Sequence, residues 1–461
     1  MASKVIQDAR IQTLNDKEQT QGDYVLYWLQ ASQRAEDNWA LEYAVQQANR
    51  LKKPLLVGFG LMDDYPEANL RHYVFMLEGL QDVQASLKRR NIKMVVQRGS
   101  PDEVALELGK DAALVVTDRG YLRIQKAWRE RVAEGLECKL VQVEDNVVVP
   151  VDLASDKREH AARTIRPKIH KHLEDFLVDL TTTAVDKSSL NLSADSVDLS
   201  NPEELARGMK LEQQVEPVSQ FFKGGTSQAK AIFRTFLEEK FSDYDENRNQ
   251  PQTSDVSHMS KYLHFGQVSP VYLVQEVRHS GGSQKNTESF VEEVVVRREL
   301  AMNFVNFTSD YDSYTCLPDW AKKTLEEHKD DQRDEVYTRS ELENAETHDD
   351  YWNAAMNEMR YTGYMHNYMR MYWGKKILEW TNTPQYAHET TLYLNNKYFL
   401  DGRDPNSFSN VAWIFGNHDR GWTERAIFGK VRYMNANGLK RKADPDAYVE
   451  KVNELVEQAK S

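Results

Sequence analysis

Between residues 24 and 150, short apolar runs alternate with amphipathic stretches, and this alternation constrains the fold more than any other feature of the chain. The apolar runs predict five buried strands, at residues 24–29, 54–60, 93–97, 113–117 and 139–143. The stretches between them predict four helices, at about residues 36–50, 70–88, 102–108 and 122–133. Strands and helices that alternate at this spacing predict a Rossmann-like α/β domain with a doubly wound, five-stranded parallel sheet. No G-x-G-x-x-G follows the first strand, so dinucleotide binding of the Rossmann fingerprint type is not predicted there.

The rest of the chain has a different pattern, and at 461 residues we expect two domains. Residues 1–23 are polar and of mixed charge, and they predict an N-terminal tail before an α/β domain at 24–173. Residues 174–214 are rich in Ser, Thr, Asp and Glu, which predicts a long, mostly irregular interdomain connector. Residues 215–461 show helical periodicity with few β-branched runs, which predicts an all-α domain. Its clearest helices are expected at 228–240, 269–278, 289–304 and 366–380.

Composition excludes several classes of protein. No apolar run approaches the roughly 18 residues of a membrane span, and the N-terminus has no apolar signal-peptide core. The two cysteines, Cys138 and Cys316, are too few for a disulfide framework or a cysteine-type zinc site. His264 and His418 lack metal-ligand spacing with a third donor, so no metal site is predicted. We expect a soluble, reduced, cytoplasmic monomer, and import into a nucleus or organelle stays compatible with the sequence.

The formal net charge of −13 argues, as an average, against nucleic-acid binding, because affinity for phosphate comes largely from Lys and Arg. Residues 430–442 are an exception, since they carry five basic residues and no acidic one. This segment predicts either a local basic patch on an acidic body or a solvated basic face.

Four tryptophans gather in the C-terminal half of the chain: Trp352, Trp373, Trp380 and Trp413. Trp373 and Trp380 are seven residues apart on one expected helix, which places both indoles on one face, roughly 10 Å apart along the axis. That spacing suits electron hopping between the rings, and it equally suits an ordinary buried aromatic stripe.

Eight short segments occur in an order that carries more information than any one of them. They include Tyr-Leu-His-Phe-Gly-Gln and Gly-Asn-His-Asp-Arg-Gly-Trp, and they lie at residues 33–41, 163–168, 222–225, 262–267, 296–301, 352–406, 416–422 and 429–434. Together they closely resemble the class II cyclobutane pyrimidine dimer photolyases of the photolyase/cryptochrome superfamily, from about residue 24 to residue 457 and most weakly in the connector. The resemblance implies FAD in the helical domain, active as FADH⁻, and light-driven electron transfer to a pyrimidine dimer flipped out of double-stranded DNA.

The same resemblance assigns residues to the flavin. A pyrophosphate cradle is implied at Tyr244, Ser257, Met259 and Ser260, and contacts to the flavin ring at Arg370, Asn395 and Asp401. The simpler interpretations are helix N-caps for the two serines, surface charges for the arginine and the aspartate, and a turn residue for the asparagine. Lys261 stands where the family's Leu-Ser-Pro-Tyr string has proline, which leaves the geometry of the cradle less fixed.

The same resemblance assigns residues to electron supply and to binding of the dimer. Trp373 is implied nearest to the flavin, Trp352 in the middle and Trp380 at the surface. Glu293 is implied as a hydrogen-bonding partner of the dimer, while its neighbour Glu292 should point elsewhere on the helix. Packing against the dimer is implied for Met371 and Trp413, and DNA contacts for Arg248, Arg420, Lys430 and Arg432. Arg432 would fill the gap left by the flipped bases, and plain surface arginines are the simpler interpretation.

Two further questions stay open at this point. Met302 stands where an aspartate is expected in this family, so the polarity beside Asn303 is in doubt. An antenna chromophore in the N-terminal domain varies within the family, and a deazaflavin is one option. The alternative function is a cryptochrome-like photoreceptor that signals through a protein partner. Such proteins usually carry a long C-terminal extension, whereas this chain is expected to end about twenty residues after Lys442.

Overall fold

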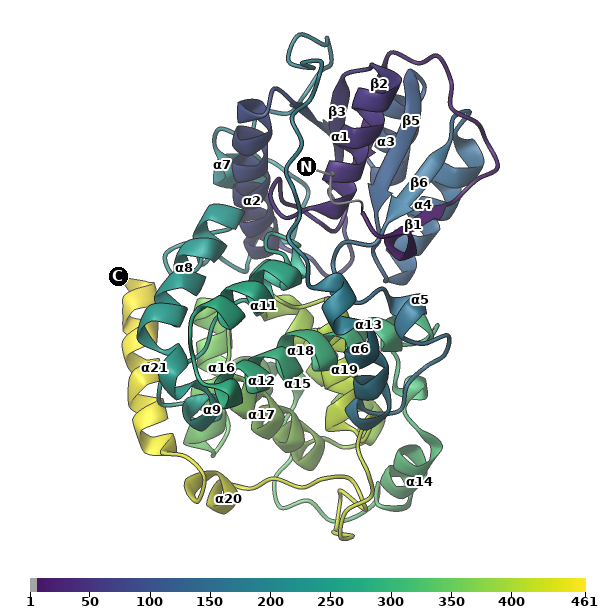
Figure 1. Ribbon diagram of the computed structural model, residues 1–461. Coiled ribbons are helices and arrows are strands. Elements are labelled where there is room, and N and C mark those ends of the chain that lie inside the picture. The colour runs from purple at the N-terminus through teal and green to yellow at the C-terminus, as the bar shows by residue number, and fades with distance from the viewer. Residues whose placement is uncertain (1–5) are drawn as a thin grey trace.

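The computed structural model describes residues 6–461, and it has an α/β part joined to a larger helical part (Figure 1). The α/β part holds a six-stranded sheet in the order β1-β6-β5-β2-β3-β4. Its strands are β1 (Ile11–Thr13), β2 (Tyr24–Trp28), β3 (Leu55–Leu61), β4 (Lys93–Arg98), β5 (Ala112–Asp118) and β6 (Leu140–Val143). The helices between them are α1 (Trp39–Leu51), α2 (Leu70–Arg89), α3 (Pro101–Gly109) and α4 (Arg123–Gly135).

The predicted parallel strands are confirmed, because β2 to β6 pair in parallel and helices cover both faces of the sheet. Every residue of β3 and β5 is buried, which explains why these strands read as continuous apolar runs. In β2, Val25 and Tyr27 belong to the core under α1 and α2, whereas Leu26 and Trp28 belong to the core under α3 and α4.

The predicted number of five strands is wrong, because part of the expected N-terminal tail adds a sixth strand at the edge. In β1, Ile11 lies opposite Val143 of β6, and the two strands are antiparallel. The strand was missed because its three residues form no apolar run and face solvent for the most part. Next to it, Arg10 is buried and donates hydrogen bonds to backbone carbonyls of residues 144, 147 and 148. Residues 1–5 of the expected tail lie outside the described residues.

The segment predicted as a connector follows the β4 edge of the sheet. The backbone amide of Val197 donates to the carbonyl of Val96 over 2.7 Å, and the amide of Lys93 donates to the hydroxyl of Ser189. The segment also contains one short helix, α7 (Pro202–Arg207), which packs against α2. The predicted domain boundaries themselves stay predictions.

The helical part confirms the predicted all-α class. Its helices are α5 (Val151–Ala154), α6 (Ala162–Phe176), α8 (Thr226–Glu239), α9 (Tyr244–Asn247), α10 (Ser260–His264), α11 (Pro270–His279), α12 (Gln284–Val291), α13 (Arg298–Asn306), α14 (Asp319–Glu327), α15 (Arg339–Glu343), α16 (Asp350–Thr362), α17 (Asn367–Trp380), α18 (Pro384–Tyr398), α19 (Pro405–Ile414), α20 (Ala436–Lys440) and α21 (Pro445–Lys460). The helix predicted at 289–304 is a composite, since a π-helical segment, η3 (Glu292–Arg297), joins α12 to α13. Such π segments often occur at functional sites, and this one carries Glu293.

Buried arginines hold the two parts together. Arg34 forms a buried ion pair with Asp145 and donates to the carbonyl of Gly266 over 3.0 Å. From the helical side, Arg298 donates to the carbonyl of Asn146 over 2.5 Å. Because these side chains are almost completely buried, their hydrogen bonds fix the sheet against the helices. Among residues 6–461, no helix combines the length and the apolar character needed to cross a membrane.

Candidate functional site

A polar cavity of about 230 Å³ lies within the helical part, between α9, η3, α10 and α17, and we call it the flavin cavity for the residues predicted to line it. Six of the seven residues assigned to the cofactor line it: Tyr244, Ser257, Met259, Ser260, Arg370 and Asp401. They come from segments up to 157 residues apart, and the tertiary fold brings them to one place. The individual roles assigned to them stay predictions.

Arg370 and Asp401 form a bidentate ion pair in this cavity. The guanidinium donates to both carboxylate oxygens, over 3.1 and 3.0 Å, and it lies 3.9 Å from the centre of the Phe399 ring. Burial alone would raise the pKa of Asp401, but the charge and hydrogen bonds of Arg370 outweigh it, and the pKa lies below its ordinary value. Since Asp401 is only 7% exposed, the interpretation of these two residues as surface charges is wrong.

Asn395 is buried on α18, so the interpretation as a turn residue is wrong. Its side-chain nitrogen donates to the side-chain oxygen of Asn396 over 2.9 Å. It is absent from the walls of the flavin cavity, and its predicted contact with the flavin ring stays a prediction.

Three of the tryptophans form a continuous buried group on α16 and α17. The indole nitrogen of Trp352 donates to the backbone carbonyl of Trp373 over 2.9 Å, and the rings of Trp352 and Trp380 lie 5.7 Å apart. Trp380 is only 3% exposed, so its predicted position at the surface is wrong. Tyr337 and His348 cover its ring at 5.5 and 5.2 Å, and they come from a segment that the sequence pattern does not connect to this helix.

Glu293 faces the flavin cavity and pairs with Arg248, whose guanidinium lies 2.7 Å from its carboxylate. Arg248 was predicted as a DNA contact, whereas the structure directs its charge to this carboxylate. Glu292 points away, as predicted, and pairs with Arg166 and Arg297. The two adjacent glutamates therefore have separate partners and separate surroundings.

Met371 on α17 and Trp413 on α19 are both partly buried, and neither lines the flavin cavity. The guanidinium of Arg297 lies 5.5 Å from the Trp413 ring centre, and the indole nitrogen of Trp413 has no hydrogen-bond partner. Met302 is buried in the core, while Asn303 beside it bonds to the backbone of Lys157 and residue 159, which satisfies its amide.

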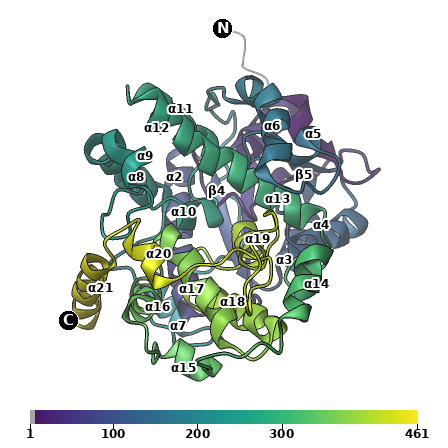
Figure 2. The same cartoon turned by 90° about the horizontal axis from the view of Figure 1, so that it is seen from below.

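The segment after α19 returns across the face of α17, α18 and α19 toward α20 (Figure 2). On it, Arg420 and Arg432 flank the ring of Trp422, each 5.3 Å from the ring centre. Trp422 is 42% exposed, which is unusual for such a large apolar side chain. Its indole and the two guanidiniums form a basic, aromatic projection. Lys430 is exposed nearby, and its ammonium lies 3.9 Å from the carboxylate of Glu424. Sequence reasoning named the basic residues and missed this tryptophan, although it ends one of the quoted motifs.

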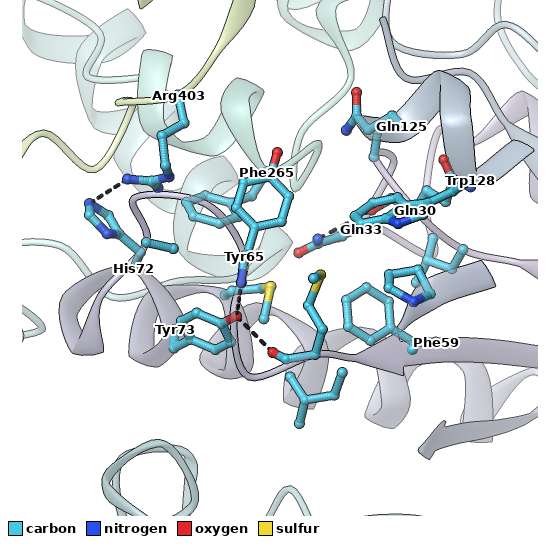
Figure 3. A pocket seen from close by; sticks show the side chains of 18 of the residues that line it. Gln30, Gln33, Phe59, Tyr65, His72, Tyr73, Gln125, Trp128, Phe265 and Arg403 are labelled. Carbon is cyan, nitrogen blue, oxygen red and sulfur yellow. Dashed lines mark hydrogen bonds between the residues drawn. The ribbon is translucent and has the colours of Figure 1, made fainter. Parts of the chain in front are cut away.

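A second cavity of about 110 Å³ lies at the carboxyl ends of β2 and β3, where they meet α10 (Figure 3), and we call it the interdomain cavity. Aromatic rings wall it: Phe59, Tyr65, Tyr73, Trp128 and Phe265. Both side-chain polar atoms of Gln30 and the side-chain oxygen of Gln33 are buried there without a hydrogen-bond partner. The crevice outside the carboxyl ends of parallel strands is the usual ligand site of open α/β sheets.

Among residues 6–461, no three His, Cys, Asp or Glu side chains gather into a group that could hold a metal ion.

The chain is similar to several known proteins. Residues 25–186 match the family model described as DNA photolyase. The chain is 51% identical to the deoxyribodipyrimidine photo-lyase of Methanothermobacter thermautotrophicus, over 98% of this chain and 100% of that protein. Its fold is similar to the archaeal photolyase from Sulfolobus tokodaii solved with two FAD molecules, with a TM-score of 0.68, 17% identity, and coverage of 95% of this chain and 91% of that one.

A cryptochrome of Synechocystis is similar in fold as well, with a TM-score of 0.66, 15% identity, and coverage of 94% of this chain and 99% of that one. At these identities the solved structures show the fold alone, whereas 51% identity over nearly the whole length shows the family. With its α/β sheet, its helical part and its cavity around the Arg370–Asp401 pair, the chain belongs to the deoxyribodipyrimidine photo-lyase family of DNA repair enzymes, within the photolyase/cryptochrome superfamily.

Proposed function

We propose that this protein repairs cyclobutane pyrimidine dimers in double-stranded DNA, using light and a reduced FAD held in the flavin cavity. The Arg370–Asp401 pair in a cavity walled by polar groups carries this proposal, because Arg370 lies on the same helix, α17, as two of the clustered tryptophans. When bound and excited by light, the reduced flavin would supply the electron that opens the dimer.

The chemistry of the cavity fits a flavin nucleotide. Hydroxyl groups of Tyr244, Ser257 and Ser260 are suited to phosphate and ribityl oxygens, and the cation of Arg370 would stabilise a reduced, anionic ring bound beside it. The structurally similar photolyase of Sulfolobus tokodaii was solved with two FAD molecules, which supports a flavin nucleotide in this fold.

Electrons would reach the flavin through the tryptophans of α16 and α17. Trp373 would act nearest to the flavin, Trp352 next, and Trp380 last, and the contact between the last two rings supports direct transfer. Because Trp380 is buried, an electron from solvent has to pass the cover formed by Tyr337 and His348.

The dimer would bind against Glu293, with Met371 and Trp413 as apolar walls. Arg248 pairs with Glu293 in the free protein, and displacement of that arginine would free the carboxyl for the dimer's carbonyl edge. The projection with Arg420, Lys430 and Arg432 would contact the DNA, with Arg432 in the gap left by the flipped bases.

The interdomain cavity would hold the antenna chromophore. Its aromatic walls suit a planar ring system, and the unpartnered amide of Gln30 with the side-chain oxygen of Gln33 suits a ring edge that carries both donors and acceptors. A deazaflavin or a second flavin meets both requirements. An absorption band that remains after FAD is bleached by reduction would reveal it.

The deciding experiment illuminates the purified protein, with fully reduced FAD, in the presence of dimer-containing duplex DNA, and follows the loss of the dimer. Rapid loss that requires light supports repair. An intact dimer, with flavin bound and photochemically active, would refute repair and favour the cryptochrome-like photoreceptor, whose fold is equally similar.

A further inference from the structure

Lys261 is a buried lysine in the wall of the helical part, directly behind the flavin cavity. Its residue is 1% exposed, and its neighbours in sequence, Met259 and Ser260, line that cavity. The ammonium donates to the backbone carbonyl of His258 over 3.1 Å and lies 3.7 and 4.9 Å from the ring centres of Phe222 and Tyr364. It has therefore been taken out of water with one hydrogen bond and two aromatic faces.

No carboxylate within residues 6–461 forms an ion pair with Lys261. The acids that face it are Asp401, already paired with Arg370 through two hydrogen bonds, and Glu358, which accepts from Tyr448 and from the amide of His366. An ammonium in such a place is unfavourable without an anion nearby, because burial removes its hydration.

The charged and titratable groups around Lys261 come from every element packed against it. Asp401 and Arg370 lie on the loop after α18 and on α17, Glu358 lies on α16, and His258 and Tyr364 lie on the adjoining loops. Burial lowers the pKa of Lys261 to about 7, an effect that Arg370 reinforces and Asp401 and Glu358 oppose. Burial, and next the charge of Lys261, also lower the pKa of His258 well below its ordinary value, which favours the neutral imidazole.

Four of these neighbours also line the flavin cavity: His258, Tyr364, Arg370 and Asp401. A single layer of side chains therefore separates the ammonium from the space where the nucleotide would lie. On the other side, a cavity of about 120 Å³ shares His258 and Tyr364 and reaches the exposed Ser254, which provides room for proton exchange with solvent.

We propose that Lys261 is the proton-linked counter-charge of the bound flavin nucleotide: it is largely neutral in the flavin-free protein above neutral pH, and it takes up a proton when the anionic nucleotide enters the cavity. The inference rests on the proposed binding of FAD in that cavity. The negative charge that acts on Lys261 is either the pyrophosphate or the reduced ring, and both would favour the ammonium form in the same way. Lys261 is a positioning residue, since it acts through the wall of the cavity.

The test measures how FAD affinity depends on pH, with the flavin-free full chain and oxidised FAD between pH 6 and pH 9. If binding takes up one proton, the affinity for FAD falls by up to tenfold for each unit that the pH rises. Wild-type affinity should therefore fall by up to about 100-fold from pH 7 to pH 9. Lys261→Met should bind more weakly than wild type at pH 6 and show no such fall. The matched control is Lys375→Met, because Lys375 is equally buried, donates to a backbone carbonyl and is absent from the flavin cavity. That control should keep the wild-type pH dependence.

A second measurement needs no variant that folds. Calorimetry of FAD binding to wild type at pH 8, in two buffers of different ionisation enthalpy, should show uptake of close to one proton, and at pH 6 close to none. The proposal would be overturned if calorimetry showed no proton uptake at pH 8 and the reduction potential showed no pH dependence beyond that of the flavin's own proton.

The two sources of charge give different results. Proton uptake with oxidised FAD assigns the charge to the pyrophosphate, and riboflavin should then bind without it. If oxidised FAD binds independently of pH, the reduced ring is the remaining source of the charge. The midpoint potential of the holoenzyme should then show an extra pH dependence of about 30 mV per pH unit, which is the tenfold change for a two-electron couple. Lys261→Met should lose this extra dependence. Wild type that fails to bind FAD at any pH would refute the proposed function. Wild type and Lys261→Met with the same pH dependence would refute only this inference.

Discussion

Replacement of Asp401 by Asn tests the ion pair on which the flavin cavity is built. The substitution keeps the shape of the side chain and one acceptor for Arg370, but it removes the charge and the second of two hydrogen bonds at 3.1 and 3.0 Å. Removing one partner of a buried pair usually costs about 3–5 kcal/mol, because the other charge is left without compensation. The side chain of Arg370 is 21% exposed, so water partly compensates it, and we expect the lower end of that range, about 3 kcal/mol.

A double-mutant cycle with Arg370→Met separates the pair from its surroundings. If the pair behaves as a unit, the double variant should be less destabilised than the sum of the two single variants, by about 2 kcal/mol. The measurement is urea unfolding of the flavin-free full chain, followed by tryptophan fluorescence, since the clustered tryptophans report on the helical part. A coupling free energy within about 0.5 kcal/mol of zero would show that the two residues behave like an exposed pair, and the reasoning would be refuted.

The pH dependence of the same variant gives an independent check. The pKa of Asp401 is lowered in the folded protein, so its contribution to stability is fully present above the unfolded pKa of about 3.9 and is lost as the pH falls through the folded value. The difference in unfolding free energy between wild type and Asp401→Asn should therefore be constant from pH 5 to pH 8 and shrink in stronger acid. A difference in unfolding free energy that grows below pH 4 would contradict this reasoning.

Three further predictions concern electron supply, DNA and the dimer. Trp373→Phe should block photoreduction of oxidised FAD and leave repair by pre-reduced enzyme nearly intact, and photoreduction at the wild-type rate would exclude the assigned path. Arg432→Ala should weaken binding to a dimer in duplex DNA more than binding to a dimer in single-stranded DNA, and equal losses on both DNAs would indicate a simple phosphate contact. Wild-type binding should be salt-sensitive despite the net charge of −13, and the slope of log affinity against log salt concentration should change by roughly −0.9 for each phosphate contacted. Glu293→Gln should lower the quantum yield of dimer splitting several-fold at saturating DNA with fully reduced flavin, and Glu293→Ala should lower it further, because Gln keeps a donor. An unchanged yield in the alanine variant would place the dimer elsewhere.

Much of the architecture follows from local pattern in the sequence. The runs that became β3 and β5 are buried on both faces, so they are apolar at nearly every position, with Thr117 and Asp118 at the end of β5 as exceptions, and such runs can be recognised without knowledge of the fold. The family resemblance that the ordered motifs carry likewise named six residues that line one cavity. The spacing of Trp373 and Trp380 correctly placed both on α17, since helical periodicity depends only on the chain itself.

Exposure and pairing were decided by the tertiary structure, because they depend on segments that are distant in the chain. Trp380 is buried only because Tyr337 and His348 pack over it, and the pattern around residue 380 contains no trace of that cover. The charge of Arg248 is directed to Glu293, which lies 45 residues further along the chain. The sequence marks Lys261 only as a departure from the proline expected at that position, and the fold alone encloses it between two aromatic rings behind the flavin cavity. A side chain's period is set by its own helix or strand, whereas its dielectric surroundings and its partner are set by whatever the rest of the molecule places against it.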